Sequence, residues 1–305
     1  MNVTANEPLM VTIRCLTYNQ ANYIRRCLDG FVMQKTNFRF AAIVHDDAST
    51  DGTAAVIREY AEKYPDIIKP LYETENQYSK HDGSLGRIMN AHTHGKYVAM
   101  CEGDDYWTDP MKLQQQVDFM EAHPECALTY HACENLFEGE RRKAYGECVK
   151  SGYSPVELMR YPFQTSTVVL RKCVLVSDLY AKARAIGCTS GDEILFLTAS
   201  CFGTIRGFNR RMSVYRRHDG GMSQRMYAPD HMWKNFNDWL QVAELFGGDV
   251  GEWIRKRRLS DYLRHAILHG HSALAARMVR LCARRSPVTI PYVAVVMVRR
   301  FFGKA

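Results

Sequence analysis

Four consecutive residues, Glu102-Gly103-Asp104-Asp105, bring three carboxylates together directly after the apolar run Tyr97 to Cys101. The run has the length and bounds of a buried strand. Carboxylates this close repel one another, so a cation stabilises them. Oxygen ligands suit a hard divalent ion such as Mg²⁺ or Mn²⁺, which often also binds substrate phosphates. Taken alone, the same residues fit equally well an acidic turn before a helix that begins near Pro110.

A second polar cluster, His45-Asp46-Asp47, follows another apolar run at Phe40 to Val44. The next residues, Ser49 to Gly52, supply turn and N-cap chemistry for a helix. Asp47 could therefore serve only as a turn former. If both apolar runs are parallel strands, both acidic clusters face the same edge of one sheet, where such sheets bind their ligands.

Strand-like and helix-like segments alternate along the first part of the chain, which predicts an α/β protein with a mainly parallel sheet flanked by helices. Expected strands lie at residues 10–16, 40–44, 67–72, 97–101, 127–131, 165–170, 203–208 and 212–215. Expected helices lie at 53–63, 85–94 and 110–123, and the pattern becomes helical again beyond residue 223.

The bulk composition is that of an ordinary globular protein: 305 residues, 46% hydrophobic and 24% charged. No amino-terminal stretch has the pattern of a secretory signal. The ten cysteines are scattered, with no CxxC pair. We therefore expect reduced thiols and a cytoplasmic location.

The net charge of +7 is concentrated near the carboxyl end, where twelve Lys or Arg residues between Gly251 and Ala305 face only Glu252 and Asp261. The apolar run at 288–298 is too short to span a bilayer, which needs about 20 residues. This region is expected to lie on the inner face of the cytoplasmic membrane as a peripheral, interfacial segment. A dimerisation element is the alternative, and no nucleic-acid-binding motif accompanies the basic residues.

Several motifs occur in a fixed order: Leu16-Thr17-Tyr18-Asn19, His45 to Thr53, Gly86 to Asn90 and Glu102 to Trp107. Together they resemble glycosyltransferase family 2, with its Rossmann-like GT-A fold, of the bacterial surface-polysaccharide type. The resemblance implies a GT-A catalytic domain at residues 1–222. Its nucleotide-sugar half would span about 1–105 and its acceptor half about 106–222, followed by a helical, basic region at 223–305.

The resemblance also implies which residues bind the nucleotide-sugar donor. In such enzymes an aromatic residue after the first strand stacks on the base, and a carboxylate after the second strand accepts the imide N–H of uracil. The matching positions are Thr17, Tyr18, Asn19, Asp46, Asp47, Arg87 and Asp104.

The acidic cluster matches the metal-binding Asp-x-Asp of the family, except that Glu102 stands at the first position. The resemblance implies Asp104 as the main ligand of Mn²⁺ or Mg²⁺, with Glu102 and Asp105 in support. His218, which follows a late strand, is a further candidate for the metal or the diphosphate. A bound metal would stabilise the charge that develops on the departing nucleoside diphosphate.

An inverting transferase needs a base to take the proton of the acceptor hydroxyl. The family places an Asp or Glu near the start of a helix after the acceptor segment. Asp192 fits that position, Glu193 is the alternative, and a simple helix cap is the competing interpretation. Thr165 and Ser166 match the acceptor segment.

The sequence thus predicts an inverting, metal-dependent glycosyltransferase that moves a sugar from a nucleotide-sugar, with a UDP-sugar the expected donor. The acceptor would be a glycan or lipid-linked glycan of surface polysaccharide biosynthesis. A sugar nucleotidyltransferase is a weaker alternative, because Thr17 to Gln20 stand where those enzymes carry a Gly-rich basic loop. A non-catalytic sugar- or membrane-binding relative is the third hypothesis.

Overall fold

The computed structural model describes residues 7–137, 140–145, 157, 163–188, 190–218 and 229–294. The chain divides into two compact units, one formed by Met1–Ala181 with Asp192–Asp219, the other by Lys182–Gly191 with Gly220–Ala305. The functional division at residue 222 stays a prediction.

Among the described residues, the first unit contains a single nine-stranded sheet, which confirms the α/β fold class. Its order is β3-β2-β1-β4-β8-β6-β9-β5, with β7 paired to β6. The strands are β1 (Leu9–Thr17), β2 (Arg39–Asp46), β3 (Ile68–Tyr72), β4 (Tyr97–Met100), β5 (Tyr106–Trp107), β6 (Cys126–Phe137), β7 (Glu140–Tyr145), β8 (Val169–Arg171) and β9 (Thr204–Arg217).

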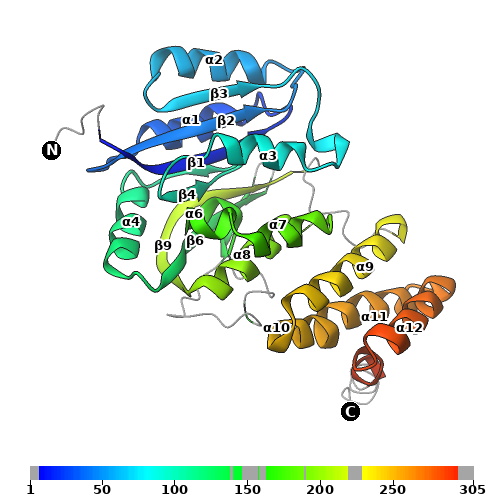
Figure 1. The fold of residues 1–305 in the computed structure, drawn as a ribbon. Coiled ribbons are helices and arrows are strands. Elements are labelled where there is room, and N and C mark those ends of the chain that lie inside the picture. The colour runs from blue at the N-terminus through cyan, green and yellow to red at the C-terminus, as the bar shows by residue number, and fades with distance from the viewer. Residues whose placement is uncertain are drawn as a thin grey trace. The chain divides into compact units, whose positions relative to one another are not determined.

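The strands β1 to β4 pair in parallel, as their apolar runs and the intervening helices predict. These helices are α1 (Ile24–Val32), α2 (Thr53–Lys63) and α3 (Ser84–Ala91). In α1, residues Ile24, Cys27, Leu28 and Phe31 recur at helical spacing and are buried against the sheet. Figure 1 shows α2 alongside β3 at one edge of the sheet.

The sheet has a hydrophobic core on each face, and β4 contributes to both. Tyr97 and Ala99 lie in the core that contains α1 and α4 (Lys112–Ala122), whereas Val98 lies in the core that contains α8 (Gly191–Phe202). Alternate side chains of a strand point to opposite faces. Coverage on both faces is typical of parallel sheets.

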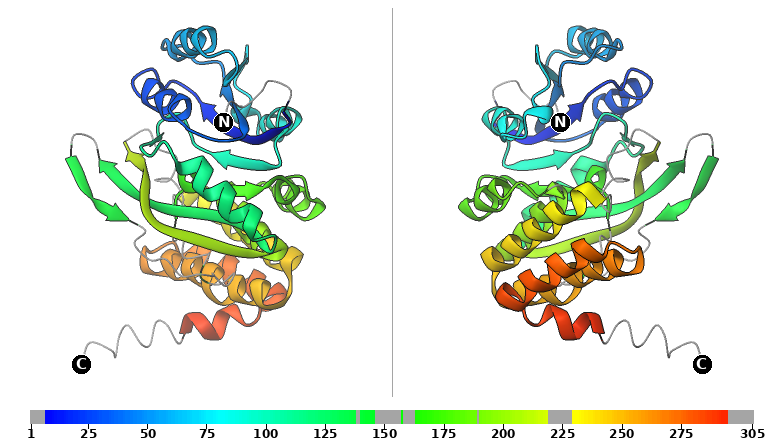
Figure 2. Two further views of the ribbon diagram at one scale, coloured as in Figure 1. Left: turned by 90° about the vertical axis from the view of Figure 1, so that its left-hand side faces the viewer. Right: turned by 90° about the vertical axis from the view of Figure 1, so that its right-hand side faces the viewer.

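The second half of the sheet differs from the expected pattern in two places. Residues 203–208 and 212–215 belong to one long strand, β9, because it pairs in parallel with β6 along its length, with register shifts near Ala132 and Arg211. Of the expected strand at 165–170, only Val169 and Leu170 belong to a strand, β8, which continues to Arg171, and Thr165–Thr167 forms a 3-10 turn, η2. In Figure 2, β6 and β7 project from the sheet as a hairpin.

The second unit is helical, as expected. Its helices are α9 (Pro229–Phe246), α10 (Gly248–Trp253), the π-helix η4 (Ile254–Arg258), α11 (Leu259–Leu268) and α12 (Ser272–Arg285). The helix α6 (Lys172–Leu175) belongs to the first unit, and α7 (Asp178–Ala185) has residues in both units. Its core contains Phe236, Trp239, Tyr262 and Met278. Within the residues that the structure describes, no helix has both the length and the apolar character needed to cross a membrane. The run at 288–298 lies partly outside the described residues.

Candidate functional site

The two acidic clusters lie at one edge of the sheet, at the carboxyl ends of β1, β2 and β4. Thr17 is opposite Asp46 in the β1–β2 register. The Gly103 N–H donates to the carbonyl of Leu16 at 3.0 Å, which places Glu102–Asp105, hereafter the acidic segment, beside the end of β1. Gly103 is required here, because a Cβ atom at this position would lie 2.9 Å from Thr17 Cβ.

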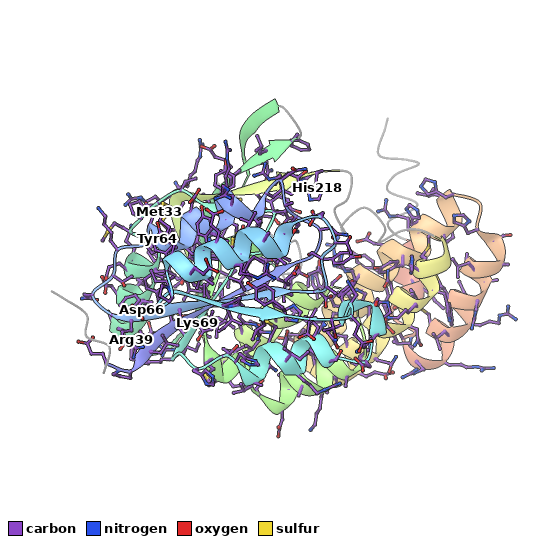
Figure 3. All side chains as sticks on the ribbon, turned by 90° about the horizontal axis from the view of Figure 1, so that it is seen from above. Met33, Arg39, Tyr64, Asp66, Lys69 and His218 are labelled. Carbon is purple, nitrogen blue, oxygen red and sulfur yellow. The ribbon has the colours of Figure 1, made fainter. Side chains whose placement is uncertain are left out.

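Asp104 contacts the side chain of His218, which lies near the carboxyl-terminal end of the first unit in the sequence. The Nε2 atom of His218, just after β9, lies 3.0 Å from Oδ2 of Asp104, and the His218 ring packs on Tyr23 with 5.1 Å between ring centres. Both side chains of the pair keep some exposure, 14% for His218 and 22% for Asp104. Figure 3 shows His218 well separated from Arg39, the first residue of β2, as expected for the carboxyl edge of the sheet.

Asp105 is turned toward the protein interior. Its Oδ1 accepts the backbone N–H of Arg216 at 2.8 Å, and the Arg216 Nε donates to the backbone carbonyl of Asp104 at 2.8 Å. Burial, together with the charge of Asp104, raises the pKa of Asp105 well above its usual range. Asp105 therefore joins the acidic segment to the end of β9.

Glu102 is a carboxyl whose ionised form its surroundings disfavour. Burial, together with the charges of Asp104 and Asp192, raises its pKa to about 7. Within the described part of the chain, no three His, Cys, Asp or Glu side chains converge to hold a metal. The donors nevertheless fit a divalent ion, because Asp104 and His218 present oxygen and nitrogen side by side and a cation would favour the ionised form of Glu102.

Asp192 and Glu193 lie in the first turn of α8. Asp192 is partly exposed and its Oδ1 accepts the N–H of Glu193 at 2.8 Å, whereas Glu193 is buried, with 7% exposure. Of the two candidate bases, Asp192 is thus the more accessible. Its effect on the pKa of Glu102 places it near the acidic segment.

The loop after β1 combines one exposed aromatic ring with buried polar atoms. Tyr18 is 49% exposed, which leaves its ring free to stack on a planar ligand. Asn19 has a positive φ of 52° and accepts the N–H of Thr50 at 2.8 Å, so it fastens this loop to the one after β2. Thr17 is buried, and its hydroxyl has no hydrogen-bond partner among the residues described.

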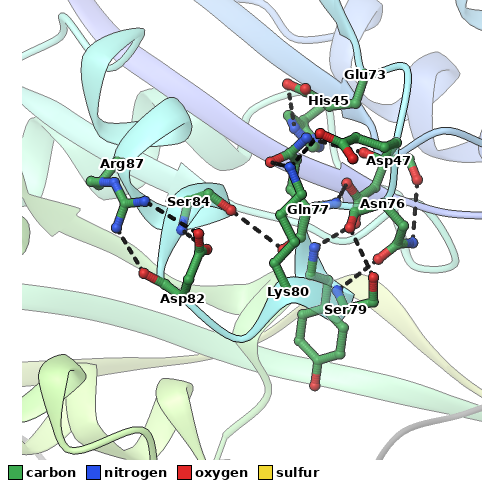
Figure 4. A network of polar contacts seen from close by, with 12 residues as sticks. His45, Asp47, Glu73, Asn76, Gln77, Ser79, Lys80, Asp82, Ser84 and Arg87 are labelled. Atoms are coloured by element: carbon green, nitrogen blue, oxygen red, sulfur yellow. Dashed lines mark hydrogen bonds and ion pairs between the residues drawn. The ribbon is translucent and has the colours of Figure 1, made fainter.

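Asp46 and Asp47 are both buried but do different things. Asp46 Oδ1 has no hydrogen-bond partner within the described structure, and burial raises the pKa of this carboxyl. Asp47 accepts the backbone N–H of Gln77 at 2.6 Å and that of Tyr78 at 3.0 Å, one on each oxygen (Figure 4). Asp47 thus holds the loop after β3, and its role as acceptor for a base stays a prediction.

Arg87 lies in α3 and is tied to the same loop. Its Nη1 donates to the carbonyl of Asp82 at 2.8 Å, and Ser84 Oγ donates to the carbonyl of Gln77 at 3.4 Å (Figure 4). The side chain of Arg87 is 68% exposed. It is therefore available to a ligand, and the polar contacts of Arg87 within the described residues are with Asp82 and not with Glu102–Asp105.

The acceptor candidates Thr165 and Ser166 lie in η2. Ser166 is fully buried, and its carbonyl accepts the indole N–H of Trp107 at 2.8 Å. Because Trp107 is two residues beyond Asp105, this bond joins η2 to the acidic segment. Sequence reasoning included Trp107 only as the last residue of the Glu102 to Trp107 motif and gave it no role. It also passed over Tyr23, for which the sequence offers no comparable sign.

Comparisons with known proteins agree with this geometry. The family model described as glycosyl transferase family 2 matches residues 13–184, more than half of the chain. "Uncharacterized protein Rv1520" of Mycobacterium tuberculosis is 36% identical over 221 residues, which are 72% of this chain and 62% of that protein. The chain therefore spans less than two thirds of that relative. The "putative teichuronic acid biosynthesis glycosyltransferase TuaG" of Bacillus subtilis is 30% identical over 40% of this chain and 45% of its own.

Solved structures share the fold. S. aureus TarS in complex with UDP-GlcNAc has a TM-score of 0.63 at 17% identity, covering 85% of this chain and 73% of its own. The mannosyltransferase PcManGT of Pyrobaculum calidifontis, in complex with GDP-Man and Mn²⁺, has a TM-score of 0.53 at 19% identity, covering 100% and 91%. The described part of the chain has the GT-A-like sheet and the acidic edge expected from the sequence, and it belongs to glycosyl transferase family 2.

Proposed function

We propose that this glycosyltransferase is inverting and metal-dependent, with Asp192 as the base. The observation that supports this most directly is electrostatic: the charge of Asp192 contributes to the raised pKa of Glu102. This supports assigning a base candidate and a metal-ligand candidate from distant parts of the chain to one site. That combination is what an inverting transfer needs.

The residues divide the chemistry between them. Asp192, at the start of α8, takes the proton of the acceptor hydroxyl as it attacks the anomeric carbon. Asp104 and His218 would hold the divalent ion, with Glu102 and Asp105 in support. When bound, Mn²⁺ or Mg²⁺ supplies positive charge that stabilises the departing nucleoside diphosphate. Arg216, whose Nε bonds to the Asp104 carbonyl, keeps this segment in place.

We assign a nucleotide-sugar donor to the edge formed by β1 and β2. Tyr18 offers an exposed ring for a base, and the unpartnered oxygens of Thr17 and Asp46 offer hydrogen-bond acceptors. A carboxylate suits the imide of uracil, which supports a UDP-sugar. The same chemistry would accept the N–H groups of guanine.

We assign a glycan or lipid-linked glycan as the acceptor, in line with the name of TuaG as a putative teichuronic acid biosynthesis glycosyltransferase. The helical unit supports peripheral binding to an anionic membrane, because exposed Ile267, Leu268 and Val279 lie on the same helices as several arginines. A homodimer through this unit is the competing proposal.

Calorimetry with nucleotide diphosphates tests the donor site. The titration uses UDP, GDP, ADP, CDP and dTDP, each with and without Mn²⁺. We expect one nucleotide to bind in a metal-dependent manner, with Asp104→Ala removing the metal dependence. Asp192→Asn should keep this binding and abolish transfer from the corresponding nucleotide-sugar. Metal-independent binding in the unaltered protein, or full transfer by Asp192→Asn, would contradict the proposal.

A further inference from the structure

Lys112, the first residue of α4, is fully buried. Lysine is rarely buried completely unless a carboxylate pairs with it, and no carboxylate forms an ion pair with Lys112 in the described part of the chain. Burial lowers the pKa of its amine to about 7. A side chain this costly to bury needs compensating contacts.

Two contacts account for the position of the Lys112 amine. Its Nζ donates to Oε1 of Gln116 at 2.8 Å, one turn along the same helix. The same atom lies 4.1 Å from the centre of the Trp107 ring, which is the arrangement of a cation–π contact. Lys112 therefore joins Trp107 to Gln116.

Both of these partners bind η2, the turn that contains the acceptor candidates. The indole N–H of Trp107 donates to the carbonyl of Ser166 at 2.8 Å. Nε2 of Gln116 donates to the carbonyl of Thr167 at 3.0 Å. The carbonyls of two consecutive residues of η2 are thus held by the two side chains that meet at the Lys112 amine.

Trp107 is fixed on its other sides. It packs edge-on against Phe31 with 5.0 Å between ring centres, and a Cβ atom at Gly30 would lie 2.9 Å from its backbone nitrogen. Its backbone pairs with Ser213 of β9. Removal of the Lys112 amine would therefore leave Trp107 in place and loosen chiefly Gln116 and η2.

We infer that Lys112 is a positioning residue: its amine rests on the fixed Trp107 ring, holds Gln116, and through Gln116 holds η2, with Thr165 and Ser166, in register with the Glu102–Asp105 segment. The link between η2 and acceptor binding rests on the proposed function. The mechanical role of Lys112 does not, and it can be measured without any substrate.

Amide hydrogen exchange on the full chain tests the inference. The readouts are the N–H groups of Thr167 and Val168, which donate within η2 to Gln164 at 3.0 Å and to Thr165 at 3.1 Å. Lys112→Met keeps the length and burial of the side chain and removes the amine. We expect these two amides to exchange about tenfold faster, the factor for the loss of about one net hydrogen bond. Amides of β1 and β2 should keep their protection.

Lys96→Met is the matched control. Lys96 also lies over an aromatic ring, that of Tyr97 at 5.4 Å, and bonds to Glu121 at 2.6 Å, but it precedes β4 instead of following it. Lys112→Arg should restore protection of η2, because a guanidinium can contact both Trp107 and Gln116. Unchanged exchange of Thr167 and Val168 in Lys112→Met would overturn the inference, and so would equal acceleration in Lys96→Met.

Kinetics then connect η2 with transfer. With the donor and acceptor identified by activity screening, Lys112→Met should raise the KM for the acceptor about fivefold and leave the KM for the donor within about twofold. A change in the donor KM alone would contradict a role through η2. If the unaltered protein binds no nucleotide, the proposed function fails, while the exchange measurement still decides whether Lys112 holds the turn.

Should Lys112→Met fail to fold, the exchange comparison is made on Lys112→Arg and Gln116→Leu. Gln116→Leu removes the bond to Thr167 directly and should accelerate the same two amides. If Gln116→Leu leaves them protected, η2 does not depend on this set of contacts and the inference is wrong.

Discussion

His218 Nε2 lies 3.0 Å from Asp104 Oδ2, although 114 residues separate the two in the sequence. The contact joins the segment after β4 to the end of β9. An imidazole and a carboxylate placed side by side can bind one divalent ion, or can bind each other when no ion is present. The pair therefore joins the carboxyl end of β9 to the proposed metal site.

His218→Ala should weaken Mn²⁺-dependent nucleotide binding by about tenfold, because loss of one metal ligand or its immediate support typically costs at least that much. Calorimetry with the nucleotide selected above and Mn²⁺ measures the effect. His92→Ala is a suitable control, since His92 is exposed and its ring bonds to the carbonyl of Ile88 at 2.9 Å, in the helix that it follows. Equal affinity in both variants would remove His218 from the site.

Glu102→Gln should stabilise the metal-free protein above about pH 7. Because burial and Asp104 raise the pKa of Glu102 from 4.5 to about 7, the native state binds more protons than the unfolded state between these values. Stability contributed by this group therefore falls as pH rises from 4.5 to 7, and the glutamine variant avoids that loss. Urea unfolding at pH 5 and pH 8 measures it, and an equal stability difference at both values would contradict the assignment.

Asp46→Asn and Asp47→Asn should separate ligand binding from loop stability. Asp47→Asn should cost about 1–3 kcal/mol, because a neutral amide cannot replace a carboxylate that accepts two backbone N–H groups. Asp46→Asn removes a buried carboxyl whose pKa is already raised. The free energy of unfolding of this variant should therefore stay the same or increase, while its nucleotide binding weakens. Urea unfolding and calorimetry on both variants check this, and a reversed pattern would exchange the two roles.

The sequence predicted the first half of the sheet well because its information there is local. Apolar runs such as Phe40 to Val44 mark strands that are buried on both faces, and each is followed by polar residues at the expected edge. The break expected within β9 was wrong because exposed Asn209, Arg210 and Arg211 resemble a turn. Their extended conformation depends on pairing with β6, which no local pattern reveals.

Long-range packing sets what the sequence could not predict about the candidate site. Spacing alone does not show that His218 meets Asp104, or that Asp47 holds the loop at Gln77 and Tyr78. Lys112 stands at a helix start, where a lysine is ordinarily exposed. Its burial arises only because Trp107 and Gln116 enclose it.

The helical unit should bind anionic vesicles in a salt-dependent manner. Arg280 and Arg284 are exposed one turn apart on α12, and each basic residue near the surface contributes about 1 kcal/mol. Reversing both to Glu should therefore weaken binding to phosphatidylserine vesicles at least about thirtyfold, because the new carboxylates also repel the anionic lipid. Reversal of Arg58 and Lys63 on α2 of the first unit is the control. Vesicle sedimentation measures the affinity of both double variants. If the two variants lose the same affinity, the net charge of the protein and not the helical unit determines binding.

Lys112→Met should change how stability depends on pH. The amine has a pKa of about 7 in the native protein against 10.5 for an ordinary lysine, so between these values the unfolded state binds the extra proton. Stability of the unaltered protein should therefore rise with pH relative to Lys112→Met, by about 1 kcal/mol per pH unit. Urea unfolding of both proteins between pH 7 and pH 8.5 measures the difference. The neighbouring groups His131 and Cys101 do not titrate between pH 7 and pH 8.5. Burial lowers the pKa of His131 well below its usual value and raises that of Cys101 to about 12, and both residues remain in the variant. A constant difference across this range would show that Lys112 keeps its proton, which would require a counter-charge outside the described residues.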